Sequence, residues 1–306
     1  MNVKMIIPMM MIAAMPMGAD AQNKSGLVMQ NLDKTVKPAD DFYQFATGGW
    51  QKNHPLPAAY SRFGSFDQLA EDNNKRINDI LAELQKKSYK KGTIEQKLSD
   101  FYKQALDMES RNKVGIAPVK PLLDEMEAAK SKADLEKIQL KYAAQGYGVS
   151  FGGGFGADEK NVTMNIFQLS QGGLTLGQKD YYVNNDEATV AIREAFKKYI
   201  ADMFKLYGFS AEQAEEKAQA VFQHETMLAL ISKSATELRN PQANYNKMTL
   251  KEFQSSYPNL HLEEMCNAEG IKSEFIQDMI VGQPAFMEGL DKITAAESAA
   301  TLKALM

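Results

Sequence analysis

Apolar residues recur with a helical period through most of the 306-residue chain. Two such stripes follow one another, formed by Leu69, Ile77, Ile80, Leu81 and Leu84 and then by Leu98, Phe101, Tyr102, Ala105 and Leu106. Spacings of this kind predict amphipathic helices, each with one face toward a core. The basic segment KKSYKKG between the two stripes is interpreted as a solvated turn.

Further helices are predicted along the second half of the chain. The segment APVKPLLDEMEAA places prolines where a first helical turn tolerates them, and KADLEKIQLKYAAQG predicts a helix that ends near Gly146. Two longer helices are expected at 187–207 and 210–234, the second with Ser210 as its N-cap. After the turn-rich segment RNPQANYNKMTLKEF, short helices are expected around Glu263, Ser273 and Pro284.

Two segments depart from the helical period. Residues 149–155 and 162–169 alternate between apolar and polar positions around a polar turn, which predicts a β-hairpin. The glycines of FGGGFG precede neither a Lys-Ser/Thr pair nor a helix-opening GxGxxG, so a nucleotide site is not expected. The segment DDFYQFATGGW is expected to wrap onto a core instead of forming a regular helix, because Gly48 and Gly49 favour a tight or closely packed backbone.

Composition places the chain among ordinary soluble globular proteins, with 44% hydrophobic and 24% charged residues. Its length predicts one large or two modest domains. The 35 basic and 39 acidic side chains leave a net charge of -4, so a nucleic-acid partner is not expected.

The N-terminus has the features of a secretory signal peptide over residues 1–21. Lys4 precedes an apolar run from Met5 to Met17, and the small residues around Ala21 predict cleavage before Gln22. The apolar run is too short to span a bilayer as a helix, and its prolines also disfavour the alternative of a membrane anchor. A polar linker is expected over 22–38, with no membrane span after cleavage. Because Cys266 is the only cysteine, no internal disulfide can form, which favours a bacterial protein of the periplasm or extracellular space.

The segment VFQHETMLAL contains His-Glu-Thr-Met-Leu, which is one residue short of the zinc-peptidase signature His-Glu-x-x-His. Leu228 stands where the second histidine would be, and the other histidines, His54 and His261, are scattered. No metal site and no catalytic residue are therefore predicted in this chain. His224 is interpreted as a half-buried packing residue of an amphipathic helix, with Glu225 at the edge of its apolar stripe.

Several unusual sequence blocks occur in a fixed order between about Asp40 and Leu290. They are DDFYQFATGGW, SRFGSFDQL, FYKQALDMESRNKVGIAPVKPLL, GGLTLGQKDYYV and RNPQANYNKMTL. These blocks resemble the N-terminal region of the neprilysin and endothelin-converting-enzyme family of zinc metalloendopeptidases. The resemblance covers residues 39–306 and implies a mainly α, multi-helix lobe with one small β-hairpin. In that family this lobe caps a second, zinc-bearing lobe and encloses a chamber that admits peptides of modest size.

The resemblance also implies roles for three residues near the start of the second block. Arg62 matches an arginine that holds the C-terminal carboxylate of the substrate, a task that suits a planar bidentate donor. Phe66 matches a wall of the pocket for the residue after the scissile bond, and Asp67 is the neighbouring polar residue. Ala70 replaces a second arginine that is frequent in the family, which places a preference for releasing dipeptides in doubt. Thr47 replaces a cysteine of the vertebrate members.

The implied activity is proteolysis, with peptides as substrates and zinc as the cofactor of the full-length enzyme. The zinc motif of the family lies several hundred residues downstream, in a C-terminal half that this sequence does not include, so the chain alone is expected to bind no zinc and to be inactive. His224 stands where the family usually has an apolar residue, and Glu225 matches a structural glutamate. Two alternatives stay open, a stand-alone peptide-binding or adhesion module and a self-sufficient hydrolase with a novel site. The final helix AESAATLKALM stops without a terminating signal, which favours a truncated enzyme over a stand-alone module.

Overall fold

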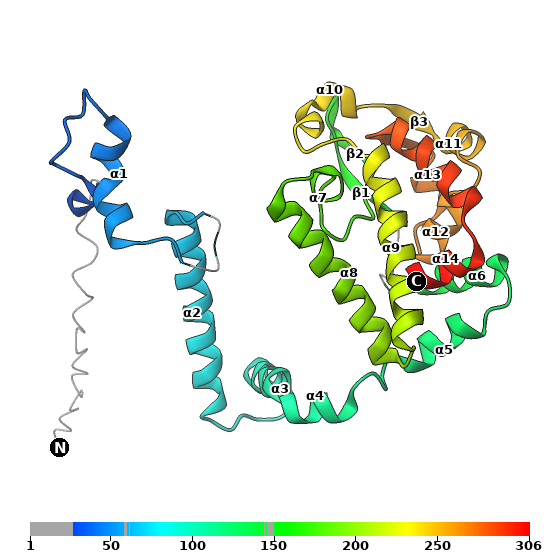
Figure 1. The fold of residues 1–306 in the computed structure, drawn as a ribbon, viewed down its shortest axis with the longest axis horizontal. Coiled ribbons are helices and arrows are strands. Elements are labelled where there is room, and N and C mark those ends of the chain that lie inside the picture. The colour runs from blue at the N-terminus through cyan, green and yellow to red at the C-terminus, as the bar shows by residue number, and fades with distance from the viewer. Residues whose placement is uncertain (1–26, 58–59, 61, 144, 146–149) are drawn as a thin grey trace, which may run out of the picture. The chain divides into compact units, whose positions relative to one another are not determined.

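The computed structural model describes residues 27–306 except 58–59, 61, 144 and 146–149, and the chain divides into two compact units (Figure 1). The first unit is Met1–Asp107 and the second is Met108–Met306. The proposed signal peptide and the beginning of the linker lie outside the described residues. No helix in the described part of the chain is long and apolar enough to cross a membrane.

The described part of the first unit consists of helices joined by turns and irregular segments. They are a 3₁₀ helix η2 (Met29–Asn31), α1 (Phe42–Asn53), α2 (Ser65–Gln85) and α3 (Ile94–Leu106). The two helices predicted from the apolar stripes correspond to α2 and α3, and these two helices contact each other. Each begins at a defined cap: Asp67 accepts from Gly64 N at 2.8 Å before α2, and Thr93 accepts from Gln96 N before α3.

Helix α1 contradicts the expectation that DDFYQFATGGW forms no regular helix. Asp41 caps it by accepting a hydrogen bond from Gln44 N at 2.9 Å, and the helix continues through both glycines. A Cβ atom on Gly49 would lie 2.3 Å from the backbone oxygen of Gln30, so the glycine allows η2 to approach the helix. The inference of close packing was correct, but the glycines form a contact surface within a helix and do not break it.

The apolar stripes of α2 and α3 are largely exposed, which differs from the expectation that they face a core. Ile80 is 61% exposed and Phe101 is 74% exposed, and among the described residues of this unit only Gly48 is buried. Burial of apolar side chains supplies most of the stability of a fold. This unit therefore gains little stability from the contacts that the structure describes.

The second unit holds the hydrophobic core and most of the secondary structure. Its α-helices are α4 (Met108–Val114), α5 (Lys120–Ala128), α6 (Lys132–Ala143), α7 (Asp180–Val183), α8 (Glu187–Tyr207), α9 (Ala211–Ile231), α10 (Pro241–Asn244), α11 (Leu250–Ser256), α12 (Leu262–Ala268), α13 (Pro284–Ala296) and α14 (Ala299–Leu305). Two 3₁₀ helices, η3 (Glu237–Arg239) and η4 (Ser273–Phe275), complete the set in the described residues. The helix expected around Ser273 is therefore a single 3₁₀ turn, whereas the one at Pro284 is longer than expected.

A small mixed sheet lies in the second unit. Its strands are β1 (Phe151–Asp158), β2 (Asn161–Gln171), β3 (Lys247–Thr249) and β4 (Asp278–Val281), in the order β1-β2-β4-β3. The antiparallel pair β1–β2 confirms the predicted hairpin, although Val149 lies outside the described residues. Strands β3 and β4 were not predicted, because strands of three and four residues offer too few positions to show an alternating pattern. β4 pairs parallel to β2 and antiparallel to β3.

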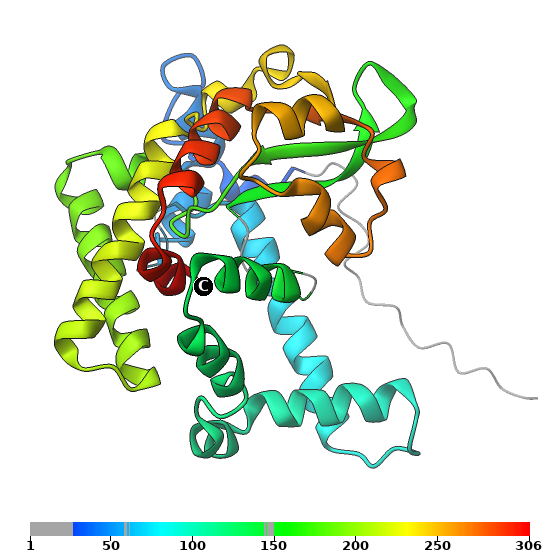
Figure 2. The same cartoon turned by 90° about the vertical axis from the view of Figure 1, so that its right-hand side faces the viewer.

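The larger core lies between one face of this sheet and helices α9, α11, α12 and α13. Figure 2 shows the last of these helices, α12 and α13, coloured orange to red, beside the green strands β1 and β2. The largest fully buried side chains of this core are Phe253, Phe286, Leu169, Leu228, Ile276, Met279, Met287, Leu290 and Val281. The core thus joins the β1–β2 hairpin to helices that come later in the chain.

A second core lies where α7, α8 and α9 meet, and Figure 1 shows α8 and α9 side by side. Small residues of α9, Ala214, Ala218 and Ala229, allow this close approach. The N-cap prediction for α9 is confirmed, because Ser210 Oγ accepts from Gln213 N at 3.2 Å and Ser210 N donates to Gln213 Oε1 at 3.2 Å. Helix α9 therefore contributes to both cores, because its Leu228 packs in the larger core beside the sheet.

Candidate functional site

The three residues implied by resemblance lie at the junction between α1 and α2. Arg62 is exposed in the irregular segment before α2, and it has no hydrogen-bond or ion-pair partner among the described residues. Phe66, in the first turn of α2, is 87% exposed. Asp67 is half-buried and its carboxylate caps α2 through Gly64 N. The geometry gives Asp67 a structural task and leaves the side chains of Arg62 and Phe66 available.

Aromatic side chains hold this junction in place around Arg62. The rings of Trp50 and His54 stack with centroids 4.5 Å apart, and Trp50 also stacks on Phe63 at 6.2 Å. The Tyr60 ring meets the edge of Phe63 at 5.1 Å, and Tyr60 OH donates to Glu71 Oε1 at 2.7 Å. That hydrogen bond to a carboxylate raises the pKa of Tyr60. Arg62 is thereby presented from a backbone that aromatic residues anchor on both sides.

The glutamate of HETML is buried and fully used, which corrects its assignment to the edge of the helix. Glu225 is 6% exposed and accepts hydrogen bonds from Thr175 N at 3.1 Å, from Thr175 Oγ1 at 2.7 Å and from Tyr182 OH. Tyr182 OH in turn accepts from Leu176 N at 3.0 Å. Burial, followed by the hydrogen bond to Glu225, raises the pKa of Tyr182. Glu225 therefore anchors the segment GGLTLGQKDYY onto α9.

The adjacent histidine is also more buried than expected. His224 is 5% exposed, and its Nδ1 lies 2.7 Å from Oε1 of Glu297, which follows α13. The contact is an ion pair when the imidazole is protonated, but neither atom has a hydrogen-bond partner among the described residues. Sequence periodicity placed His224 on the correct stripe. It could not reveal a carboxylate that comes from more than seventy positions further along the chain.

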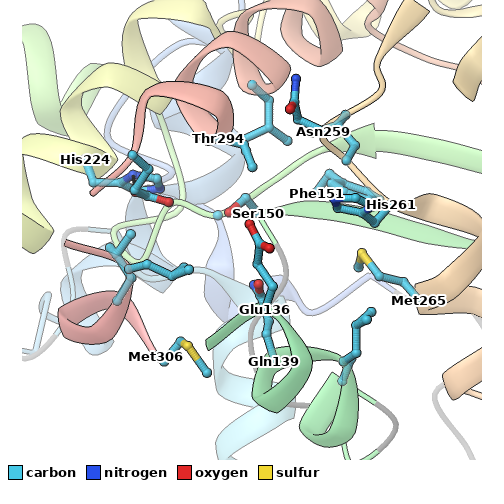
Figure 3. Close-up of a pocket in the computed structure, with 18 of the residues that line it drawn as sticks. Glu136, Gln139, Ser150, Phe151, His224, Asn259, His261, Met265, Thr294 and Met306 are labelled. Atoms are coloured by element: carbon cyan, nitrogen blue, oxygen red, sulfur yellow. Dashed lines mark ion pairs between the residues drawn. The ribbon is translucent and has the colours of Figure 1, made fainter. Parts of the chain in front are cut away.

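A cavity of about 450 Å³ opens beside this pair within the second unit. Figure 3 shows His224 on one side of it, Glu136 and Gln139 from α6 below, and Thr294 and Asn259 above. His261, at the start of α12, faces it from the other side. The lining combines apolar side chains with a few buried polar groups, which is typical of small-molecule pockets.

A catalytic metal does not fit the residues that the structure describes. They contain no group of three or more His, Cys, Asp or Glu side chains placed to hold an ion. His54 stacks on Trp50 in the first unit, whereas His224 and His261 lie in the second. No step of a zinc-dependent reaction can be assigned to these residues.

Comparison with known proteins identifies the family. The N-terminal family model of peptidase family M13 matches residues 38–306. The chain is 28% identical over 283 residues to Neprilysin-3 of Drosophila melanogaster, covering 88% of this chain and 36% of that protein. It is 29% identical over 245 residues to endothelin-converting enzyme-like 1 of Rattus norvegicus, covering 75% of this chain and 31% of that protein. The chain thus spans about a third of the length of these curated relatives.

Solved structures share the fold. The zinc metalloprotease Zmp1 of Mycobacterium tuberculosis, in complex with an inhibitor, superimposes with a TM-score of 0.80 at 24% identity, covering 92% of this chain and 43% of that one. PepO from Lactobacillus rhamnosis gives a TM-score of 0.68 at 20% identity, with coverage of 89% and 42%. The match of the family model to most of the sequence confirms the predicted resemblance, and the chain belongs to peptidase family M13 as an N-terminal portion of that family's proteins.

Proposed function

We propose that this chain is the substrate-enclosing, N-terminal part of an exported zinc metalloendopeptidase that hydrolyses oligopeptides. In this proposal a second half supplies the His-Glu-x-x-His motif and the zinc, while the chain positions the peptide. The observation that carries the proposal is the match of the peptidase M13 model to residues 38–306.

The proposed contribution of this chain to catalysis is the orientation of the peptide by Arg62 and Phe66. An exposed guanidinium without a described protein partner can form two parallel hydrogen bonds with the terminal carboxylate of a peptide. The exposed Phe66 ring offers an apolar surface four residues further on. Asp67 completes the proposed substrate-binding set by holding the first turn of α2 through Gly64.

The role of Arg62 can be tested in a protein that joins this chain to the family's metal-binding half. Arg62→Ala should lower kcat/KM by about tenfold or more for peptides with a free carboxylate, since a hydrogen bond to a charged group contributes about 1.5–3 kcal/mol. The same substitution should hardly affect the matching peptide amides. Arg76→Ala is a suitable control, because Arg76 is also exposed and lies on α2. Equal losses for acids and amides would contradict the proposed role.

The proposal includes export through removal of residues 1–21. Sequencing the N-terminus of the protein recovered outside the cytoplasm of a bacterial host should give Gln22 as the first residue. An uncleaved N-terminus in a membrane fraction would instead support an anchor.

Binding of peptides without hydrolysis by the joined protein would favour the alternative of a peptide-binding module.

A further inference from the structure

The cavity beside α9 has a mixed lining, part of which is apolar. Its walls come from α6, α9, α13 and α14, from the start of β1 and from the segment around α12. The apolar lining residues that matter here are Leu140, Phe151, Met265, Leu290 and Leu302. A volume of about 450 Å³ falls within the range of about 300–1,000 Å³ that is usual for ligand pockets. The cavity can therefore accommodate a small apolar body.

Two buried polar atoms at this cavity have no hydrogen-bond partner among the described residues. His224 Nδ1 and Glu297 Oε1 lie 2.7 Å apart, and their side chains are only 6% and 7% exposed. Glu297 Oε1 has the contact of an ion pair with His224 but no hydrogen bond, and a buried carboxylate oxygen without a hydrogen bond is costly because its lost hydration is only partly replaced. The described part of the chain offers Glu297 Oε1 no N–H or O–H donor of suitable geometry.

The charges that face the cavity are predominantly negative. Glu136, Glu225 and Glu297 line it, and Lys132 is the one lysine in its described lining. The ammonium of Lys132 donates to the backbone oxygen of Thr294, and Glu225 is saturated by its hydrogen bonds to the segment after β2. His261 also lines the cavity, but its nearest acidic neighbour is Glu264 at 3.9 Å. Glu297 and Glu136 are thus the groups with unused capacity to accept hydrogen bonds.

A hydrogen-bond donor with positive charge would satisfy this arrangement. A metal ion is a poor fit, because the described residues do not gather three suitable ligands there. A carboxylate-bearing ligand would meet like charge. An alkylammonium group combines three N–H donors and one positive charge with a hydrocarbon chain, which matches both the acidic end and the apolar walls.

We propose that this cavity binds a protonated primary amine carried on an apolar chain, with the ammonium group at Glu297 and the chain against Leu290 and Leu302. This site goes beyond the proposed peptide-positioning role and does not depend on it, because none of its residues belongs to the Arg62 segment. The same chemistry is offered by a free alkylamine and by the lysine side chain of a peptide.

The test uses the 306-residue chain with isotope-labelled histidine, observed by NMR. The chain has only His54, His224 and His261, and His54 is not among the residues that line the cavity, so it serves as an internal reference. Hexylamine, hexanol and hexanoate are titrated separately near neutral pH. The proposal predicts saturable shifts of the His224 signal with hexylamine, at an affinity about tenfold higher than with hexanol, and the weakest effect with hexanoate.

Two variants locate the ammonium group. Glu297→Gln should reduce the advantage of hexylamine over hexanol to within about twofold. Glu288→Gln should leave it unchanged, since Glu288 is an exposed partner of Lys292 on α13. Equal affinity for hexylamine and hexanol, tighter binding of hexanoate, or no saturable shift of His224 would overturn the proposal. Because the three ligands are compared on the unchanged chain, the proposal is tested even if a variant fails to fold.

A second arm separates the two sources of the amine. A short apolar peptide with one lysine is compared with the same peptide carrying an acetylated lysine. Binding of the unmodified peptide alone would support the amine proposal with a lysine side chain as the source. Binding of hexylamine but of neither peptide would support a free amine. Equal binding of the two peptides would contradict the requirement for positive charge.

Discussion

The hydrogen bonds of Glu225 give the sharpest prediction about stability. Replacing this glutamate by alanine removes the acceptor for Thr175 N, Thr175 Oγ1 and Tyr182 OH in a site that is 6% exposed. Each hydrogen bond to a charged acceptor contributes about 1.5–3 kcal/mol, but losses within one network do not add. We expect Glu225→Ala to lower the free energy of unfolding by about 3–5 kcal/mol, as for other broken buried networks.

The size of the second unit converts this loss into a measurable temperature shift. For domains of about 150–250 residues, 1 kcal/mol corresponds to about 2–4 °C in Tm, so Glu225→Ala should lower Tm by roughly 10 °C. Glu225→Gln retains one acceptor oxygen and should cost about 1–2 kcal/mol. Hydrogen exchange of Leu176 N–H, which donates to Tyr182 OH, reports the same loss locally.

A matched control lies on the same helix. Glu215 is exposed on α9, and Glu215→Ala should change the free energy of unfolding by less than about 0.5 kcal/mol. If Glu225→Ala were as stable as Glu215→Ala, and Leu176 N–H exchanged no faster, the anchoring role of Glu225 would be refuted. The segment GGLTLGQKDYY would then be held by its apolar contacts alone.

Three other changes test different parts of the structure. Gly49→Ala should destabilise the contact with η2 and speed hydrogen exchange there, because its Cβ would lie 2.3 Å from Gln30 O; increased stability, as helix propensity alone predicts, would contradict this. Phe101 is exposed on α3, so Phe101→Ser should change the free energy of unfolding by under about 0.5 kcal/mol, whereas Phe253→Ala, in the core, should lower it by about 3–5 kcal/mol. Denaturant titrations that show similar losses for the two variants would contradict the exposure of α3. The pKa of Tyr182 is raised in the folded state, so the stability that this tyrosine contributes is complete below its unfolded pKa of about 10 and is lost as the pH rises above that value. Tyr182→Phe should therefore make the free energy of unfolding fall less steeply with pH above about pH 10. An unchanged slope would contradict this prediction.

Local patterns in the sequence predicted much of the helical framework. Spacing and capping chemistry correctly indicated α2, α3, α8 and α9, and alternation indicated the hairpin. These elements are determined by neighbours within a few residues, so sequence alone could identify them. The resemblance to a peptidase family supplied the fold class, which periodicity could not.

The errors share a physical cause in contacts between distant segments. Gly48 and Gly49 indicate a close approach, but the element that approaches Gly49, η2, comes from a separate segment, so the sequence did not show that the glycines pack within a helix. Strand β4 exists because Met279–Val281 pairs with a strand more than a hundred positions earlier. Glu225 lies on the face of α9 that carries the alanines packed against α8. The burial of this face was not predicted, because the prediction relied on large apolar residues.

The candidate site was less accessible to sequence reasoning than the fold. Arg62, Phe66 and Asp67 were selected by resemblance, and the structure adds that Asp67 caps α2 while Arg62 has no described partner. The cavity beside His224 could not be predicted from the sequence, because its walls come from segments that lie far apart in the sequence, between Met126 and Met306. The sequence predicted His224 as a packing residue, and only the structure shows that its Nδ1 lies beside the Glu297 carboxylate.

The most direct test of the central claim is a zinc and peptidase assay on the 306-residue chain, alone and mixed with a metal-binding half from the same family. We expect no stoichiometric zinc and no hydrolysis for the chain alone, and hydrolysis in the mixture that exceeds the activity of the metal-binding half by itself. One tightly bound zinc per chain, with hydrolysis by the chain alone that a chelator abolishes, would contradict the proposed division of labour. That result would mean that this sequence contains its own catalytic metal site.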